Sequence, residues 1–281
     1  MKPASKPPVS ALKSGVTASR PSFPVQLKPA AGVPTSNKNM TAQAPRASGA
    51  VNPKVAQKPV PSGLGLDSHA VRARMVQKLA AQGVTDPQVL AAMGQVERHR
   101  FVDSALVNQA YEDTSLPIGL GQTISKPNVV ARMLELLMRG NEGRQGKLGR
   151  VLEIGTGCGY QAAVLGQLAQ EVYSIERLRG LHDKARDNLR PMRLPNVHLM
   201  FGDGMIGYAK GAPYAAIISA AGGENIPATW IDQLAIGGRL VAPLQSANGT
   251  QALVVVDKTP QGVKQTLLEA VHFVPLKSGT S

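Results

Sequence analysis

The sequence has one cysteine, few aromatic side chains and no long apolar run. Because Cys158 has no second cysteine to pair with, a disulfide within the chain is excluded, which fits the reducing cytoplasm. No apolar run reaches the roughly 18 residues that a membrane helix needs. Residues 1–15 also lack the apolar core of a secretory signal. We therefore expect a cytoplasmic protein that is neither secreted nor embedded in a membrane.

Acidic residues are absent from the first 66 positions. This segment has nine Lys or Arg residues, so it carries +9 of the formal net charge of +13, and it holds 11 of the 21 prolines. Such a segment, without apolar periodicity, buries too little apolar surface to offset the entropy lost on folding. We predict that residues 1–66 form a disordered basic tail and that residues 67–281 form the folded domain.

The basic tail allows three interpretations. We favour a solvated extension without a specific partner. A weak, salt-sensitive contact with a polyanion would suit the charge, but Phe23 is the only aromatic residue of the tail and offers little base stacking. A transit peptide would explain the missing acidic residues, but the prolines oppose the amphipathic helix that it needs. Nucleic acid binding is therefore not expected.

Helical patterns and one long loop occupy residues 67–140. A first helix can be capped by Asp67 or Ser68 and ends before Gly83, and a second begins after Asp86.

The segment 96–125 is long, polar and turn-rich, and it has little predicted secondary structure. A loop of this length inside a compact domain is usually functional or disordered. A third helix follows at Pro127, with apolar residues at helical spacing. Ser125 is placed where it can cap that helix.

From residue 150 onward, short apolar runs alternate with helical patterns. This alternation predicts an α/β fold with a doubly wound, mostly parallel seven-stranded sheet over residues 150–276. The last two runs have no helix between them, which predicts an antiparallel C-terminal edge. The expected strands are 150–154, 171–176, 197–203, 214–220, 237–244, 251–258 and 264–276.

The stretch VLEIGTGCGY joins the first of these strands to its helix through a glycine loop. Gly155, Gly157 and Gly159 permit a tight turn and a close approach of the backbone to a ligand. A dinucleotide fingerprint would need glycine where Tyr160 stands, and a P-loop would need a lysine that is missing here. The loop therefore favours a nucleotide-like ligand that needs no phosphate cradle.

Three acidic side chains belong to predicted strand ends. Glu153 precedes the glycine loop, Glu176 could accept both hydroxyls of a ribose, and Asp203 could accept an adenine amino group. Ligands of such sheets bind at the carboxyl ends of the strands, so the three describe an adenosine site. S-adenosylmethionine fits, because it has a ribose, an adenine and a sulfonium but no phosphate. A helix cap for Asp203 and a solvated strand end for Glu176 are the simpler alternatives.

Several motifs, in this order along the chain, resemble those of the protein-L-isoaspartate O-methyltransferase family: GQTISKPNVVARMLELL, VLEIGTGCGYQAAVL, VYSIERL, GDG, GGRLVAPL and FVPL. The resemblance implies a class I methyltransferase that uses S-adenosylmethionine. It further implies methyl transfer to the free carboxylate of L-isoaspartyl or D-aspartyl residues in damaged proteins and peptides. The ester then collapses to a succinimide, whose hydrolysis restores some normal aspartate.

By the same resemblance, Ser125 is the active-site serine, Thr123 and Ile124 help to bind the substrate, and the loop 111–125 covers the site. A carboxylate is already ionised at neutral pH, so the enzyme need only align it with the methyl group and exclude water. Neither a histidine nor a metal is required, and a monomer is expected. The implied cofactor residues are Glu153, Gly155, Thr156, Gly157, Gly159, Tyr160, Glu176, Asp203 and Gly204.

Two positions depart from the family pattern. Cys158 replaces a small residue that is often serine, and SAAGGENIP at 219–227 replaces a more proline-rich segment. A class I methyltransferase acting on RNA is one alternative, but ISAAGG lacks the Asn/Asp-Pro-Pro-aromatic segment used on exocyclic amines. A non-catalytic, cofactor-binding scaffold is another, and the presence of GQTIS beside the adenosine motifs argues against it.

Overall fold

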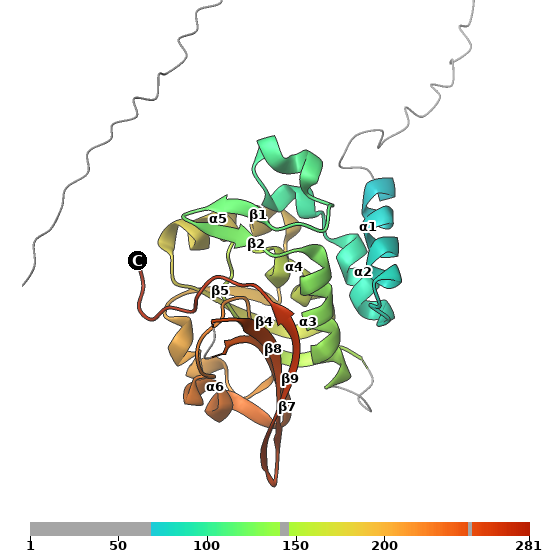
Figure 1. Ribbon diagram of the computed structural model, residues 1–281. Coiled ribbons are helices and arrows are strands. Elements are labelled where there is room, and N and C mark those ends of the chain that lie inside the picture. The colour runs from blue at the N-terminus through green and yellow to red at the C-terminus, as the bar shows by residue number, and fades with distance from the viewer. Residues whose placement is uncertain (1–68, 141–145, 247–248) are drawn as a thin grey trace, which may run out of the picture. The chain divides into compact units, whose positions relative to one another are not determined.

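The computed structural model describes residues 69–140, 146–246 and 249–281. The predicted tail, and the cap of the first helix by Asp67 or Ser68, lie outside the described residues. Within them, seven strands form one sheet in the order β5-β4-β3-β6-β7-β8-β9, and β1 and β2 form a separate hairpin (Figure 1).

The large sheet is mostly parallel, as predicted. Its first five strands in spatial order are parallel, and β8 pairs antiparallel with β7 and with β9, which forms the edge. This confirms the α/β fold with an antiparallel C-terminal edge. The strands are β3 (Leu148–Ile154), β4 (Ala169–Glu176), β5 (Val197–Phe201), β6 (Tyr214–Ser219), β7 (Leu234–Gln245), β8 (Gln251–Thr259) and β9 (Gly262–Val271).

Helices cover both faces of the sheet. On one face α3, α4 and α5 pack against the strands, with α1 and α2 behind them, whereas α6 contributes to a separate apolar cluster on the other face (Figure 1). The α-helices are α1 (His69–Ala81), α2 (Pro87–Gln95), α3 (Pro127–Arg139), α4 (Tyr160–Leu168), α5 (Arg179–Leu189) and α6 (Ala228–Gln233). Short 3₁₀ helices are η1 (Arg98–Phe101), η2 (Ser104–Gln109), η3 (Arg190–Met192), η4 (Gly204–Ile206) and η5 (Ala209–Gly211).

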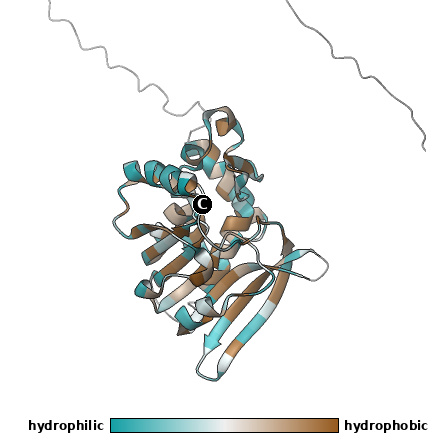
Figure 2. Cartoon of the chain, turned by 90° about the vertical axis from the view of Figure 1, so that its left-hand side faces the viewer, coloured by the Kyte–Doolittle hydropathy of each residue, from teal (hydrophilic) through white to brown (hydrophobic). Residues whose placement is uncertain are grey.

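Burial on both faces explains why the central strands are nearly continuously apolar. Along β3, Val151 belongs to the cluster under α3 and α4, while Leu152 and Ile154 belong to the cluster on the opposite face. Successive side chains of a strand point to opposite faces, so a strand covered on both sides needs apolar residues at nearly every position. Figure 2 shows the apolar residues gathered along these strands.

The helix starts are partly as predicted. The Asp86 carboxylate caps α2 by accepting hydrogen bonds from the amides of Gln88, at 2.9 Å, and Val89, at 3.0 Å. The predicted cap of α3 by Ser125 is wrong. The cap position is Lys126, which uses no side chain, and Asp113 accepts the amide of Asn128 at 2.9 Å. A carboxylate of the loop before the hairpin therefore satisfies an amide at the start of α3, and the serine hydroxyl does not cap the helix.

The segment 96–125 is more ordered than the sequence predicts. It contains η1, η2 and the hairpin of β1 (Leu116–Gly119) and β2 (Gln122–Ile124). Gly119 and Gly121, at φ +98° and +69°, make the tight turn at the tip. Such short strands leave almost no periodic signal, so only the pairing of the two runs reveals the hairpin.

Candidate active site

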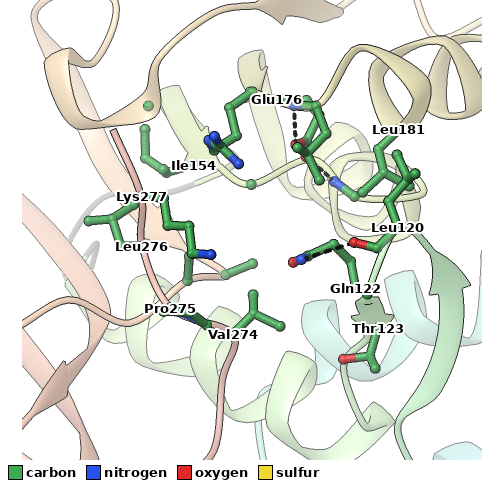
Figure 3. A pocket seen from close by; sticks show the side chains of 18 of the residues that line it. Leu120, Gln122, Thr123, Ile154, Glu176, Leu181, Val274, Pro275, Leu276 and Lys277 are labelled. Atoms are coloured by element: carbon green, nitrogen blue, oxygen red, sulfur yellow. Dashed lines mark hydrogen bonds between the residues drawn. The ribbon is translucent and has the colours of Figure 1, made fainter. Parts of the chain in front are cut away.

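A cavity of about 500 Å³ lies at the carboxyl ends of β3, β4 and β6, at the edge of the sheet where such folds bind ligands. Figure 3 shows Gln122 and Thr123 of the hairpin on one side, Val274 and Pro275 on the other, and Glu176 above them. Its volume lies within the range of roughly 300–1,000 Å³ that is usual for pockets of small molecules and cofactors. Its further lining residues are Ile118, Leu120, Gly121, Ile154, Gly155, Gly157, Ile175, Arg177, Leu178, Leu181, Gly204, Ala220, Ala221, Leu276 and Lys277.

The glycine loop forms part of the cavity wall. Gly155, Gly157 and Gly159 have φ angles of +88°, +56° and +92°. The backbone of residues with a side chain rarely adopts such angles. A Cβ atom on Gly157 would also lie 3.2 Å from Cδ1 of Ile118 in the hairpin. The backbone path of the loop therefore favours glycine at all three positions, and Gly157 also lies close to the hairpin.

Glu176, at the end of β4, is 5% exposed and lines the cavity. Its Oε2 accepts the amide of Gly157 at 2.9 Å, and its Oε1 accepts the amide of Leu178 at 2.9 Å. An ionised carboxylate has about four acceptor positions, so two remain for a ligand. Glu176 thus holds the glycine loop and offers acceptors to the cavity, as a ribose diol requires.

Glu153 lies beneath the glycine loop and not in the cavity wall. Its carboxyl accepts a hydrogen bond from the hydroxyl of Ser174, which is itself 2.6 Å from the hydroxyl of Thr156 in the loop. Complete burial raises the pKa of Glu153 to about 8, because the low-dielectric interior disfavours the charged carboxylate. The residue supports the loop from behind.

Asp203 follows β5 and holds backbone on both sides. Its Oδ1 accepts the amide of Met205 at 2.8 Å and caps η4, and its Oδ2 accepts the amide of Gly279 at 2.6 Å. Asp203 does not line the cavity, whereas its neighbour Gly204 does. In this arrangement its carboxylate fastens the C-terminal segment beside the cavity.

A smaller cavity of about 40 Å³ adjoins the large one. The two share wall residues from the hairpin and the glycine loop, among them Thr123 and Gly157. Ser125 lines the smaller cavity together with Ile124, and within the described residues its hydroxyl makes no hydrogen bond. Its full lining is Ile118, Thr123, Ile124, Ser125, Val130, Gly155, Thr156, Gly157, Cys158, Tyr160, Gln161 and Ala220.

Two buried side chains of the smaller cavity are neutral. Burial raises the pKa of the Cys158 thiol to about 11 and that of the Tyr160 phenol to about 12. The thiolate is the reactive form of cysteine, so Cys158 behaves as a small apolar residue here. The Tyr160 hydroxyl lies 3.7 Å from Sδ of Met93 in α2, which ties the glycine loop to the N-terminal helices.

The C-terminal segment forms a wall that residue-by-residue reasoning missed. Val274 accepts the amide of Gly222 at 2.8 Å, and Leu276 donates its amide to the Gly222 carbonyl at 2.7 Å. The segment 219–227, which differs from the family pattern, is therefore hydrogen-bonded to the C-terminal residues that line the cavity. The motif FVPL was the only signal in the sequence, because the contact joins residues about fifty positions apart.

Most predicted site residues come together at the two cavities. Glu153, Gly159 and Asp203 are predicted cofactor residues that line neither of them. The predicted residues that do line one or both are Thr123, Ile124, Ser125, Gly155, Thr156, Gly157, Tyr160, Glu176 and Gly204.

In the described ranges, no group of three or more His, Cys, Asp or Glu residues could hold a metal ion. No helix in the part of the chain that the structure describes is long and apolar enough to cross a membrane.

Comparisons with known proteins agree with this geometry. The profile of the protein-L-isoaspartate(D-aspartate) O-methyltransferase family matches residues 70–281. A protein-L-isoaspartate O-methyltransferase of Methylibium petroleiphilum is 64% identical over 222 residues, which cover 78% of this chain and 82% of that protein. A protein of the same name from Leptothrix cholodnii is 63% identical over 222 residues, covering 78% of each chain.

Two solved structures share the fold. One, named protein-L-isoaspartate O-methyltransferase, is 27% identical with a TM-score of 0.66 and covers 74% of this chain and 66% of its own. Another, from Plasmodium falciparum and solved with S-adenosyl-L-homocysteine, is 24% identical with a TM-score of 0.65 and covers 73% of this chain and 98% of its own. With its sheet, its glycine loop and the family profile in agreement, the chain belongs to the protein-L-isoaspartate O-methyltransferase family of class I, S-adenosylmethionine-dependent methyltransferases.

Proposed function

We propose that this chain methylates the free carboxylate of isoaspartyl residues at the junction of the two cavities. The observation that carries the proposal is their shared wall. The larger cavity has the glycine loop and Glu176, and the smaller one has the free hydroxyl of Ser125. Methyl transfer needs the donor and the acceptor in line and in contact. Two adjoining cavities with these linings would allow that arrangement, which supports the proposal.

The larger cavity suits the cofactor. The Glu176 carboxylate would accept the ribose hydroxyls, and the apolar side chains of Ile154, Ile175 and Leu181 would cover the adenine. Glu153 would act through Ser174 and Thr156 on the shape of the loop. Asp203, whose oxygens already hold Met205 and Gly279, would contribute by fastening the C-terminal segment. Bound S-adenosylmethionine supplies a methyl group that its sulfonium has already activated.

The smaller cavity and the hairpin suit the substrate carboxylate. The hydroxyl of Ser125 would donate a hydrogen bond to it, with Thr123 and Ile124 shaping the wall. Because the carboxylate is ionised at neutral pH, the chain needs no general base. Cys158 and Tyr160 are buried and neutral, and exclusion of water from this part of the site would favour attack of the carboxylate over that of water. Ser125 positions the substrate and forms no covalent bond.

The remaining aspects of the proposal rest on the sequence. We place the enzyme in the cytoplasm, as a monomer, and assign catalysis to residues 67–281. Residues 1–66 would take no part in the chemistry, so a chain that begins at residue 67 should keep its turnover. Loss of turnover on this deletion would give the tail a catalytic role instead.

The decisive experiment uses two peptides that differ only in isoaspartate or aspartate at one position. Labelled methyl from S-adenosylmethionine should appear on the isoaspartyl peptide alone, and mild base should release it, as expected of a methyl ester. Equal labelling of both peptides would contradict the substrate assignment. If neither is labelled although the cofactor binds, the proposed function fails and RNA substrates come next.

A further inference from the structure

Arg98 of η1 is a fully buried cation with 0% exposure. Within the described residues it forms no ion pair, and its Nη1 has no hydrogen-bond partner. A buried charge without a counter-ion costs stability. Residues that break such rules are expected at functional sites. The position of this guanidinium therefore needs a reason other than stability.

The guanidinium contacts both ends of the loop that covers the candidate site. Its Nε donates to the Ala110 carbonyl at 2.7 Å, and its Nη2 donates to the Ser125 carbonyl at 2.7 Å. The chain between these carbonyls carries Asp113, which holds the start of α3, and the β1–β2 hairpin. The Arg98 side chain thus joins the two ends of the loop 110–125 through their carbonyl groups.

The same guanidinium also contacts the glycine-loop side of the site. Its Cζ lies 4.8 Å from the ring centroid of Tyr160, which lines the smaller cavity together with Ser125. A cation over an aromatic ring at this distance is attracted by the ring electrons. Arg98 therefore links the backbone of Ser125 to the first residue of α4, behind the wall of the smaller cavity.

We propose that Arg98 is the positioning residue of the substrate site: its two carbonyl bonds close the loop 110–125 and hold Ser125 where its hydroxyl meets the substrate carboxylate. This proposal rests on the proposed function for the role of Ser125. The planar fork is essential, because two carbonyls are bonded by two different nitrogens. A lysine has the charge but concentrates it in one ammonium and cannot reproduce that geometry.

The test is Arg98→Lys, which keeps the buried charge. The kcat/KM for the isoaspartyl peptide should fall at least about tenfold, the cost of roughly one charge-assisted hydrogen bond, while the Kd for S-adenosyl-L-homocysteine changes less than about twofold. The matched control is Arg239→Lys. Arg239 bridges β7 to the Leu136 carbonyl of α3 and to Asp257, and it lines neither cavity. Its replacement should leave both quantities within about twofold of the wild type.

A double-mutant cycle separates positioning from general structure. In a Ser125→Ala background no hydroxyl remains to be placed, so adding Arg98→Lys should lower kcat/KM much less than it does alone. Additive losses would overturn the proposal. An Arg98→Lys variant whose peptide kinetics match the wild type, or whose cofactor affinity falls in proportion, would overturn it as well.

Hydrogen exchange tests the loop closure without relying on turnover. In Arg98→Lys, amide exchange across residues 110–125 should accelerate, and in Arg239→Lys it should not. Unchanged exchange would show that Arg98 does not close the loop, even if the wild type proved inactive on isoaspartyl peptides. A wild type that lacks activity while exchange responds as expected would contradict the proposed function and keep the loop closure.

Discussion

The two sides of the cavity are built in different ways. The cofactor side consists of strand ends and the loops that follow them, so Gly157 and Glu176 are close in sequence and are joined directly at 2.9 Å. The substrate side combines the hairpin 116–124 with the smaller cavity, whose lining joins residues of the hairpin and of α3 to the glycine loop and to Ala220 after β6. One side is local in sequence, and the other depends on tertiary contacts.

This difference predicts which property a substitution on each side should change. A change on the cofactor side acts on a loop whose backbone path is set by three glycines of positive φ, so cofactor affinity should change first. A change on the substrate side acts on the hairpin and the smaller cavity, which contacts from outside the hairpin hold in place, such as the bond of Arg98 to the Ser125 carbonyl, so peptide kinetics should change while cofactor affinity persists.

Replacement of Glu176 by alanine should have the largest effect. It removes both proposed ribose acceptors, each worth roughly 1.5–3 kcal/mol as a hydrogen bond to a charged group, so cofactor affinity should fall at least about 100-fold. Calorimetric titration with S-adenosyl-L-homocysteine measures this. Glu171→Ala, at the other end of β4 where Glu171 pairs with Arg150, is the control and should bind normally. Unchanged affinity in Glu176→Ala would remove the ribose assignment.

Stability should depend on pH through Glu153. Burial raises the pKa of Glu153 to about 8, whereas an unfolded glutamate titrates near roughly 4.3. Between these values the folded chain keeps a proton that the unfolded chain has lost, so the free energy of unfolding falls as the pH rises. Between pH 5.5 and 7.5 the free energy of unfolding should therefore decrease by about 2 kcal/mol less in Glu153→Gln, which cannot ionise, than in the wild type. Urea unfolding at both pH values measures it, and equal pH dependence in the two proteins would contradict the prediction.

Ser125→Ala should separate the two sides most cleanly. Loss of one hydrogen bond to a charged substrate should lower turnover of the isoaspartyl peptide about tenfold, and cofactor affinity should change little, because Ser125 lines only the smaller cavity. Thermal stability should be unaffected, since the hydroxyl does not cap α3. A parallel loss of cofactor affinity would show that the residue is structural.

Leu120→Ser should have the smallest effect. Leu120 is 62% exposed at the tip of the hairpin and lines the cavity mouth, so its removal should raise KM for the peptide about threefold through lost apolar contact. Ile236→Ser is the control, because Ile236 is 63% exposed and lines neither cavity. Equal peptide kinetics in the two variants would remove the hairpin tip from the substrate site.

The parts of the fold with strong local periodicity were predictable. All seven sheet strands appear where apolar periodicity predicted them, give or take a few residues at most ends, but the last strand ends at Val271 and not at residue 276. The helices predicted after Asp86 and at Pro127 also appear, and further helices alternate with the strands as expected. The elements that the sequence did not predict lie in the segment 96–125, where strands of three or four residues are too short to show an apolar periodicity. Ser125 was expected to cap α3, but the amide of Asn128 is satisfied by Asp113 of the same segment.

The sequence by itself determined the sheet, the glycine loop and the acidic residues at the strand ends, because these depend on local periodicity and on backbone angles that only glycine adopts easily. Tertiary structure alone decided which acidic side chains reach the cavity. Glu176 faces it, Glu153 is covered by the loop, and Asp203 is engaged by Gly279. It also decided that Arg98 closes the substrate loop. Burial and long-range hydrogen bonds set these roles, and neither leaves a pattern in neighbouring residues.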